Sequence, residues 1–306
     1  MSGSGSAGGA TRRLAAFVSS ARWEDLPSQL RHEAKRSLMN YFACALGGCR
    51  DAAVESTASV LARFSGAPSA TVIGRGQKLD ALNAAFLNAL SANVFDFDDT
   101  HVRTIIHPTA PVAPALFACA ETSRLPGRDL LLAFALGVEV ECRIGNAVSP
   151  GHYRRGWHIT STCGVFGAAA ATAKVLGLSA ERTKWALGNA SAQAGGLLET
   201  LGTMGKSISV GNAARNGLAA AMFAKEGVSG PEAPLEGTYG FLRVTGDAAD
   251  FSCLTEGLGE HWELSANTYK LYPTGIVLSP VIEACLALQA AHEIDVGEIE
   301  RVDITA

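Results

Sequence analysis

Acidic side chains, imidazoles and prolines gather in the stretch VFDFDDTHVRTIIHPTAPVAP, in a chain otherwise rich in alanine and leucine. Asp96 and Thr100 lie four positions apart, so they share a face if the preceding helix continues through them. His107 stands directly before a proline, and histidine titrates near neutral pH, where a side chain best gives or takes a proton. The stretch therefore predicts an acid/base site. Its composition also fits a solvated loop in which Asp98 and Asp99 face water.

A second polar cluster lies in the stretch GHYRRGWHITSTCG. His158 stands just before three hydroxyl residues, Thr160, Ser161 and Thr162, at the start of an alanine-rich helical pattern. Hydroxyls and free backbone amides at a helix N-terminus form a natural site for an anion. The cluster predicts either an anion site beside a histidine or simple N-capping of the helix by Ser161 or Thr162.

Two lysines stand in loop-like stretches further along the chain. Lys206 lies in the glycine- and serine-rich stretch TMGKSISVG, ahead of a helix, and Lys270 lies in TYKLYPTG. Such a loop can aim an ammonium group and several amides at a carboxylate, although a lone lysine is often just exposed. The first stretch is no phosphate loop, because that motif would need a glycine where the chain has Thr200.

Composition excludes several classes of protein. The chain has 306 residues, 48% of them hydrophobic and 18% charged, and a net charge of −4. This balance describes a well-packed chain that lacks the basic face needed for nucleic acid. No apolar run is long enough to span a membrane. Seven scattered cysteines, with no CxxC pair, predict reduced thiols in the cytoplasm and no metal or iron–sulfur centre.

Hydrophobic periodicity predicts a mainly all-α fold built as a large helical bundle. Alanine and glycine dominate the helical segments, which favours close approach and buried central helices. Only two stretches read as strands: a hairpin at 70–79 that turns at Gly74 and Gly76, and a terminal strand at 298–306. Residues 1–13 read as a flexible tail. The predicted helices are 27–48, 79–95, 127–148, 160–178, 179–196, 211–227 and 279–293.

Four motifs in order resemble the MmgE/PrpD family, which includes 2-methylcitrate dehydratase, cis-aconitate decarboxylase and iminodisuccinate epimerase. They are DFDDTH…HPTAPVAPAL, GHYRRGWHITSTCGVFGAAAA, GNAARNGLAAAMFAKEGVSGPEAPLEGTYGFL and YKLYPTGIVLSPVIEA. The resemblance implies an all-helical domain over 14–269, followed from 270 to 306 by the beginning of a smaller α/β lid domain. It also implies a homodimer. Family members are longer, so most of the lid is expected to be missing from this chain.

The resemblance also implies a set of site residues. The family's pocket residues match Asp96 and Thr100 in DFDDT, His107 in HPT, His158 in GWHITS, and the two lysines. We therefore expect three catalytic residues, His107, His158 and Asp96. We expect the substrate to be bound by Thr100, Lys206, Lys270, Thr160 and Ser161. Two positions depart from the family. Ser209 stands where many relatives have a histidine, and Ile159 stands where many have a proline.

These residues suit proton transfer next to a carboxylate, without a metal or an organic cofactor. The resemblance implies a lyase acting on a small di- or tricarboxylate, specifically a hydro-lyase similar to 2-methylcitrate dehydratase. An epimerase of a dicarboxylate such as iminodisuccinate and a decarboxylase of the cis-aconitate type are alternatives that use the same pocket. A further alternative is a truncated, inactive homodimer that only binds carboxylates.

Overall fold

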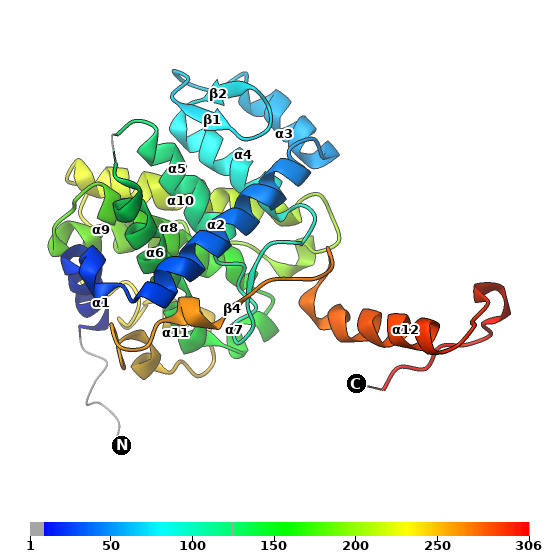
Figure 1. Ribbon diagram of the computed structural model, residues 1–306. Helices are drawn as coiled ribbons and strands as arrows, with labels where there is room; N and C mark the ends of the chain where they lie inside the picture. The colour runs from blue at the N-terminus through cyan, green and yellow to red at the C-terminus, as the bar shows by residue number, and fades with distance from the viewer. Residues whose placement is uncertain (1–8, 124, 306) are drawn as a thin grey trace.

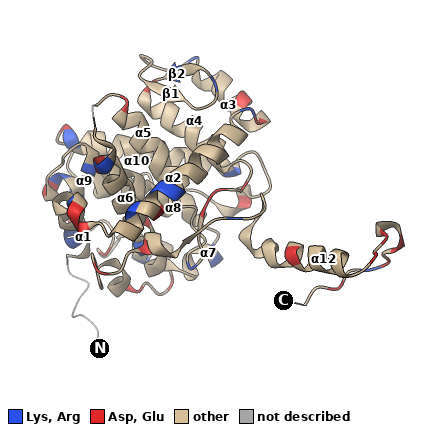
Figure 2. Cartoon of the chain, in the orientation of Figure 1, with Lys and Arg blue, Asp and Glu red and all other residues tan. Residues whose placement is uncertain are grey.

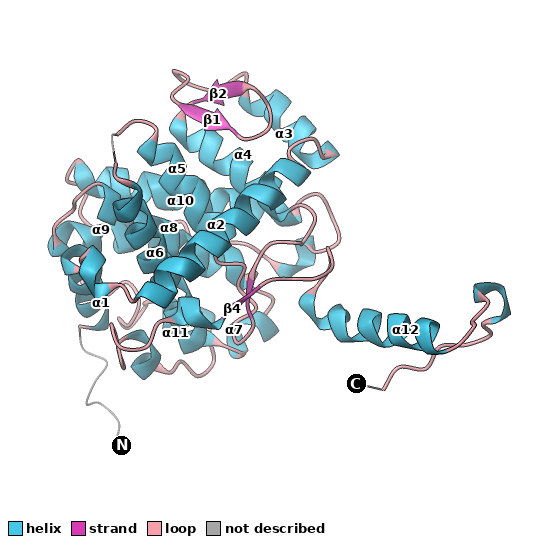
Figure 3. Ribbon diagram, in the orientation of Figure 1, coloured by secondary structure: helices cyan, strands magenta, loops and turns pink. Residues whose placement is uncertain are grey.

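The computed structural model describes residues 9–123 and 125–305, and helices dominate it (Figure 1; Figure 3). The prediction of a mainly all-α fold is confirmed. The helices are α1 (Ala10–Ser20), α2 (Ser28–Gly48), α3 (Ala52–Leu61), α4 (Ala81–Asn93), α5 (Thr109–Ala120), α6 (Gly127–Val148), α7 (Gly151–Arg154), α8 (Ile159–Val175), α9 (Ala180–Ser191), α10 (Lys206–Lys225), α11 (Phe241–Thr245) and α12 (Ser279–Ala291).

Helix α8 forms the centre of the body, with α5, α6, α9 and α10 packed around it (Figure 1). Every residue from 159 to 173 on this helix is buried. Its small side chains allow close approach: a methyl group at Gly167 would lie 2.9 Å from the Gly137 carbonyl oxygen of α6. The alanine- and glycine-rich composition thus determines how tightly the central helices pack.

The strands form two short antiparallel pairs, β1 (Ala70–Val72) with β2 (Gln77–Leu79), and β3 (Thr100–His101) with β4 (Asn267–Thr268). The first pair confirms the predicted hairpin, and Gly74 and Gly76 at its turn have φ values of 71° and 69°. The second pair joins segments far apart in the sequence.

Three local predictions differ from the structure. Helix α1 begins at Ala10, so residues 10–13 of the predicted tail are helical, while residues 1–8 lie outside the described part. Lys206 is the first residue of α10 rather than a loop residue. The predicted terminal strand is wrong over residues 299–305, which form no strand, because a lone strand has no neighbour to pair with. Ala306 lies outside the described residues.

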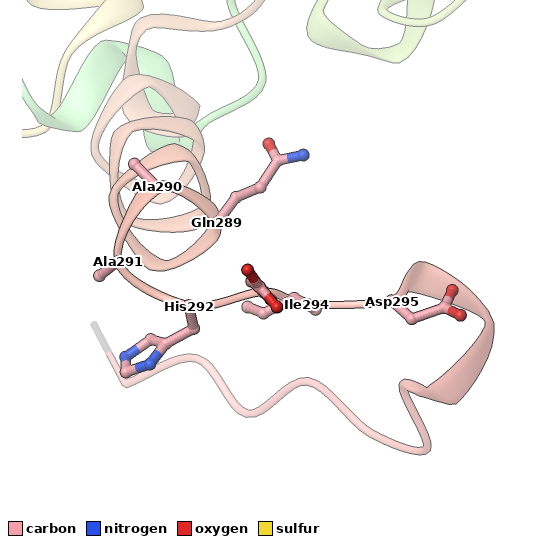
Figure 4. Close-up of a pocket in the computed structure, with 7 residues that line it drawn as sticks. Gln289, Ala290, Ala291, His292, Ile294 and Asp295 are labelled. Atoms are coloured by element: carbon pink, nitrogen blue, oxygen red, sulfur yellow. The ribbon is translucent and has the colours of Figure 1, made fainter.

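Beyond Lys270, residues 275–277 still line a cavity of the helical body, and the chain leaves the body after them (Figure 1). None of the residues 271–305 is buried, and α12 projects away from the other helices. A hollow of about 480 Å³ at the end of α12 is lined by a single continuous stretch of chain, which includes His292 and Asp295 (Figure 4). Because no other segment contributes, this hollow brings no distant groups together. The assignment of 270–306 to the start of a lid stays a prediction.

Charges of both signs are interspersed over the helical body (Figure 2). Within the described residues, no helix combines the length and apolar character needed to cross a membrane.

Candidate active site

Four of the predicted site residues, Asp96, His107, His158 and Lys206, line one cavity of about 720 Å³. Each comes from a different part of the fold. Asp96 follows α4, His107 precedes α5, His158 is the N-cap of α8, and Lys206 is the first residue of α10. The packing of these helices around α8 therefore brings residues from three separate stretches of sequence to one pocket.

The carboxylate of Asp96 is the electrostatic centre of this cavity. The Lys206 ammonium lies 2.5 Å and the Lys270 ammonium 3.2 Å from Asp96 Oδ1, and Nε2 of His107 lies 3.5 Å from the same oxygen. Burial by itself would raise the pKa of Asp96, but Lys206, His107 and Lys270 outweigh it and hold that pKa well below its usual range. Asp96 is therefore a charged anchor for its neighbours near neutral pH.

Lys270 supports Asp96 from behind the cavity wall. Its side chain is fully buried, and its ammonium donates to the Asp96 backbone oxygen at 2.6 Å and lies 4.0 Å from Asp98 Oδ1. Lys270 does not line the cavity, whereas Lys206 does. Of the two predicted substrate-binding lysines, Lys206 is thus the one placed to meet a ligand in this structure.

The loop between α4 and β3 holds Asp96 in an uncommon backbone conformation. Helix α4 ends at Asn93, and Asp96 has a φ of 53°, so the helix does not continue through these positions and the condition for Asp96 and Thr100 to share a helical face is not met. Ile105, which also lines the cavity, has a φ of 61°. A β-branched residue rarely adopts this conformation, and such strain concentrates at functional sites. Among the described residues other than glycine, these two have a positive φ.

His107 is fixed by backbone and hydroxyl groups. Its Nδ1 donates to the Asp99 carbonyl oxygen at 2.9 Å and lies 3.2 Å from Thr100 Oγ1. Its backbone N–H donates to Thr160 Oγ1 at 3.2 Å. Burial is the main cause that lowers the pKa of His107. Thr100 and Thr160, both predicted to bind substrate, therefore hold His107 in place, and their direct contact with a ligand stays a prediction.

His158 is held in the same way from the other side of the cavity. Its Nδ1 lies 2.8 Å from Ser209 Oγ, and burial lowers its pKa to about 3. Ser161 Oγ lies within hydrogen-bond distance of two carbonyl oxygens, those of His158 and Gly195, at 2.9 and 2.8 Å. The alternative of N-capping by Ser161 or Thr162 is not what the structure shows, because His158 is the N-cap and accepts no side-chain capping bond.

The two acids between Asp96 and Thr100 are buried, so the alternative of a solvated loop is wrong. Asp98 is 1% and Asp99 0% exposed. Burial raises the pKa of Asp99 to about 7, although hydrogen bonds from Thr109 and Asn267 oppose the rise. The Asn267 amide donates to Asp99 Oδ2 at 2.6 Å. Both acids lie beside His107: Asp98 Oδ1 is 3.8 Å from His107 Nδ1, and the Asp99 carbonyl accepts from the same nitrogen.

Several groups that shape the site carry no signal in the sequence. Asn93 donates to Asp98 Oδ2 at 2.8 Å and accepts from Ser207 Oγ at 2.9 Å, which ties α4 to α10 below the cavity. Tyr153 of α7 lines the cavity as well. An asparagine inside an apolar helical pattern and a tyrosine in a basic stretch give no indication of such roles.

Asp96, Asp98 and His107 each offer a ligand atom, and these atoms lie within 4.8 Å of one another. Such a cluster could hold a cation on donor chemistry alone. The ammonium groups of Lys206 and Lys270 already contact Asp96, so a metal ion there would add positive charge beside two existing cations. The donor set therefore fits a metal poorly, and the cofactor-free expectation stays a prediction.

The fold and cavity define an all-helical protein whose pocket combines two imidazoles with a carboxylate–ammonium cluster. A family model for the MmgE/PrpD N-terminal domain matches residues 12–254, so the chain belongs to the MmgE/PrpD family. The resemblance seen in the sequence is confirmed.

Curated relatives show the same kinship. The chain is 33% identical over 299 residues to a cis-aconitate decarboxylase of Aspergillus terreus, covering 93% of this chain and 61% of that protein. It is 37% identical over 185 residues to cis-aconitate decarboxylase of Homo sapiens, covering 58% of this chain and 38% of that protein. With the Mus musculus protein of the same name it shares 31% over 238 residues, 76% of this chain and 48% of that one. The chain thus spans about three fifths of the length of the Aspergillus terreus relative.

Proposed function

We propose that this chain carries the acid/base and carboxylate-binding part of a lyase that acts on a small tricarboxylate. The observation that carries the proposal is the convergence of Asp96, His107, His158 and Lys206 on one cavity of about 720 Å³. A cavity of this size accommodates a small organic acid. The catalytic and binding roles expected from the sequence remain proposals.

The electrostatics of the cavity support an anionic ligand. The Lys206 ammonium, 14% exposed, lies at the N-terminus of the 20-residue helix α10. His158 marks the N-terminus of the 17-residue helix α8. A helix N-terminus carries partial positive charge, so two helices and one ammonium direct favourable potential at the same space. A substrate carboxylate bound there would lose hydrogen bonds to water and gain hydrogen bonds to the Lys206 ammonium and to the helix N-termini.

Among lyase reactions, decarboxylation has the support of the named relatives, whereas we expected dehydration from the sequence. In decarboxylation, a carbon–carbon bond breaks, CO2 leaves, and the electron pair stays on the substrate until a proton is added. Dehydration instead removes a proton from carbon and expels hydroxide, which takes up a proton as water. Both need cations near the developing charge and an acid/base pair, which Lys206 and the two histidines offer.

Dehydration therefore stays the second candidate, and the products separate the two. Decarboxylation of cis-aconitate releases CO2, whereas a hydro-lyase converts a hydroxy acid such as 2-methylcitrate into an alkene and water. Epimerisation of iminodisuccinate is a third candidate reaction. From the family we also expect a homodimer in which a lid domain covers the cavity, and this assembly is part of the proposal.

The proposal is tested by proton NMR in D2O with cis-aconitate, 2-methylcitrate, citrate and iminodisuccinate. We expect turnover, or exchange of a carbon-bound proton, that falls by about 10²-fold or more in His107→Ala and in His158→Ala. His32→Ala is the matched control, because His32 is an exposed histidine on α2 outside the cavity. Turnover that persists in both cavity variants would contradict the proposed site, and the product identifies the reaction.

A further inference from the structure

We propose that Ser209 is a positioning residue that fixes His158 as the tautomer protonated on Nδ1, so that Nε2 is presented to the cavity as a proton acceptor. The inference starts from two hydrogen bonds of one hydroxyl group. Ser209 Oγ lies 2.8 Å from His158 Nδ1 and 2.9 Å from the Lys206 backbone oxygen. The chemistry of these two partners decides which group donates.

The direction of the two bonds follows from counting protons. A carbonyl oxygen can only accept, so the single hydroxyl proton of Ser209 is used for the bond to the Lys206 oxygen. Ser209 must then accept from the imidazole, and His158 Nδ1 must carry a proton. The Ser209 hydroxyl thus donates to the Lys206 carbonyl in the first turn of α10 and accepts from His158, the N-cap residue of α8. This second bond sets the tautomer of His158.

The other ring nitrogen of His158 is free of protein partners. All hydrogen bonds of this residue within the described chain go through its Nδ1 and its backbone, and Nε2 makes none. His158 is 4% exposed and lines the cavity. Burial is the largest cause that keeps the ring neutral, and His107 and Lys206 act in the same sense, against Asp98 and Asp96. A neutral imidazole with a protonated Nδ1 has its lone pair on Nε2.

This assignment distinguishes the two histidines. His107 also donates through Nδ1, to the Asp99 carbonyl, so its neutral ring is the same tautomer. It differs from His158 in that its Nε2 lies 3.5 Å from the Asp96 carboxylate, which opposes the lowering of its pKa by burial and favours a proton there. His158 faces no carboxylate at hydrogen-bond distance. The geometry therefore makes His158 the proton acceptor of the pair and His107 the group better placed to hold a proton. The catalytic meaning of this division rests on the proposed function, but the tautomer itself does not.

The first test reads the tautomer directly and needs no substrate. The ring nitrogens of 15N-histidine-labelled protein are observed by long-range proton–nitrogen correlation at pH 7, with His158→Gln used to assign the signals. We expect a protonated-type Nδ1 and an unprotonated-type Nε2 for His158 in the wild type. In Ser209→Ala the acceptor is lost, and we expect the two nitrogen shifts to move towards each other as both tautomers become populated.

Two further variants separate positioning from a general effect on the fold. Ser209→Thr keeps the hydroxyl and is expected to keep the Nδ1-protonated signature. Ser91→Ala is the matched control, because Ser91 is a buried helical serine whose hydroxyl donates only to a backbone carbonyl, at 2.8 Å, within α4. It is expected to leave the His158 signals unchanged. A wild-type His158 protonated on Nε2, or unchanged shifts in Ser209→Ala, would overturn the inference.

The second test is kinetic and applies to whichever substrate the protein turns over. We expect Ser209→Ala to lower kcat about tenfold, the equivalent of one hydrogen bond, with KM little changed and with activity retained in Ser209→Thr. An unchanged kcat together with a shifted tautomer would refute the acceptor role of His158 while leaving the tautomer assignment standing. If no substrate is turned over, the proposed function fails, but the nitrogen shifts still decide the tautomer.

Discussion

Helices α8 and α12 are both rich in alanine and apolar side chains, yet α8 is buried and α12 is exposed. Residues 159–173 of α8 are all buried, whereas α12 buries no residue and projects from the body (Figure 1). Helix α8 has neighbours on every side, and α12 contacts little beyond the turn that precedes it. An apolar helix is thus stabilised by its packing partners rather than by its composition.

The same contrast separates the charged groups of the two regions. Lys270 and Asp96 form an ion pair within the body, in which the lysine side chain is fully buried. Arg301 and Asp303 form one on the projecting segment, with their side chains 80% and 72% exposed. Water screens the second pair more strongly than the first, in which the Asp96 side chain is 27% exposed. Substitutions of equal chemistry in the two regions should therefore have very unequal effects.

The largest difference in the free energy of unfolding is expected between two replacements of a large apolar side chain by alanine, one in each region. Phe166→Ala should lower the free energy of unfolding by about 3–5 kcal/mol, because Phe166 is completely buried in α8 and packs edge-on against Phe241. Leu288→Ala on α12 should change it by less than about 0.5 kcal/mol, since Leu288 is 54% exposed. Urea unfolding followed by circular dichroism measures both. Similar losses in the two variants would contradict the comparison.

A smaller but still large difference is expected between the two ion pairs. Lys270→Ala should destabilise the protein by on the order of 3 kcal/mol, because the buried carboxylate of Asp98 and the partly buried carboxylate of Asp96 lose a counter-charge. Arg301→Ala should leave the unfolding midpoint unchanged. The same urea titration applies. A midpoint for Lys270→Ala equal to the wild-type value would show that the buried pair adds no stability.

A third prediction concerns Glu141, a fully buried acid of α6 whose two carboxyl oxygens have no hydrogen-bond partner. Burial raises the pKa of Glu141 well above its usual value, with Asp99 acting in the same sense. A raised pKa gives stability that is complete at pH values below the unfolded pKa, near 4.5, and is lost as the pH rises.

Glu141→Gln should therefore become more stable than the wild type as the pH rises from 5 to 8. The difference should grow by at most about 1.4 kcal/mol per pH unit. Thermal or urea unfolding at each pH measures it. Asp99, whose pKa burial raises to about 7, is present in both proteins and contributes stability of the same sign to each. Parallel stability curves for the two proteins would show that Glu141 does not hold its proton.

The smallest effect is expected at the strained loop of the cavity. Ile105→Asn should stabilise the fold by about 1 kcal/mol, because asparagine tolerates a φ near 61° better than a β-branched residue does. Ile294→Asn is the matched control, an isoleucine of similar exposure, 40% against 39%, on the projecting segment. It has no positive φ to relieve and should gain nothing. Equal shifts in melting temperature would mean that Ile105 stores no strain.

Most of the helices were predictable because helical periodicity is a local property of the chain. The prediction for 127–148 coincides with α6, and that for 279–293 differs from α12 only at its end. The helix at Ala10 was missed because small residues precede it and imitate a flexible tail. The terminal strand was wrong because strand formation depends on a partner that local sequence cannot supply.

The site shows the same division between what the sequence determined and what only the tertiary structure decided. Residue types and the resemblance to the family led to Asp96, His107, His158 and Lys206, which the structure places around one cavity, and their roles stay a prediction. Burial of Asp98 and Asp99 and the placement of Lys270 behind Asp96 came only with the fold. These features depend on contacts such as the bond from Thr268 Oγ1 to the Thr100 carbonyl, across 168 positions of sequence. Local patterns carry no information about pairings at that distance, and those pairings decide which side chains lie beside one another in the cavity.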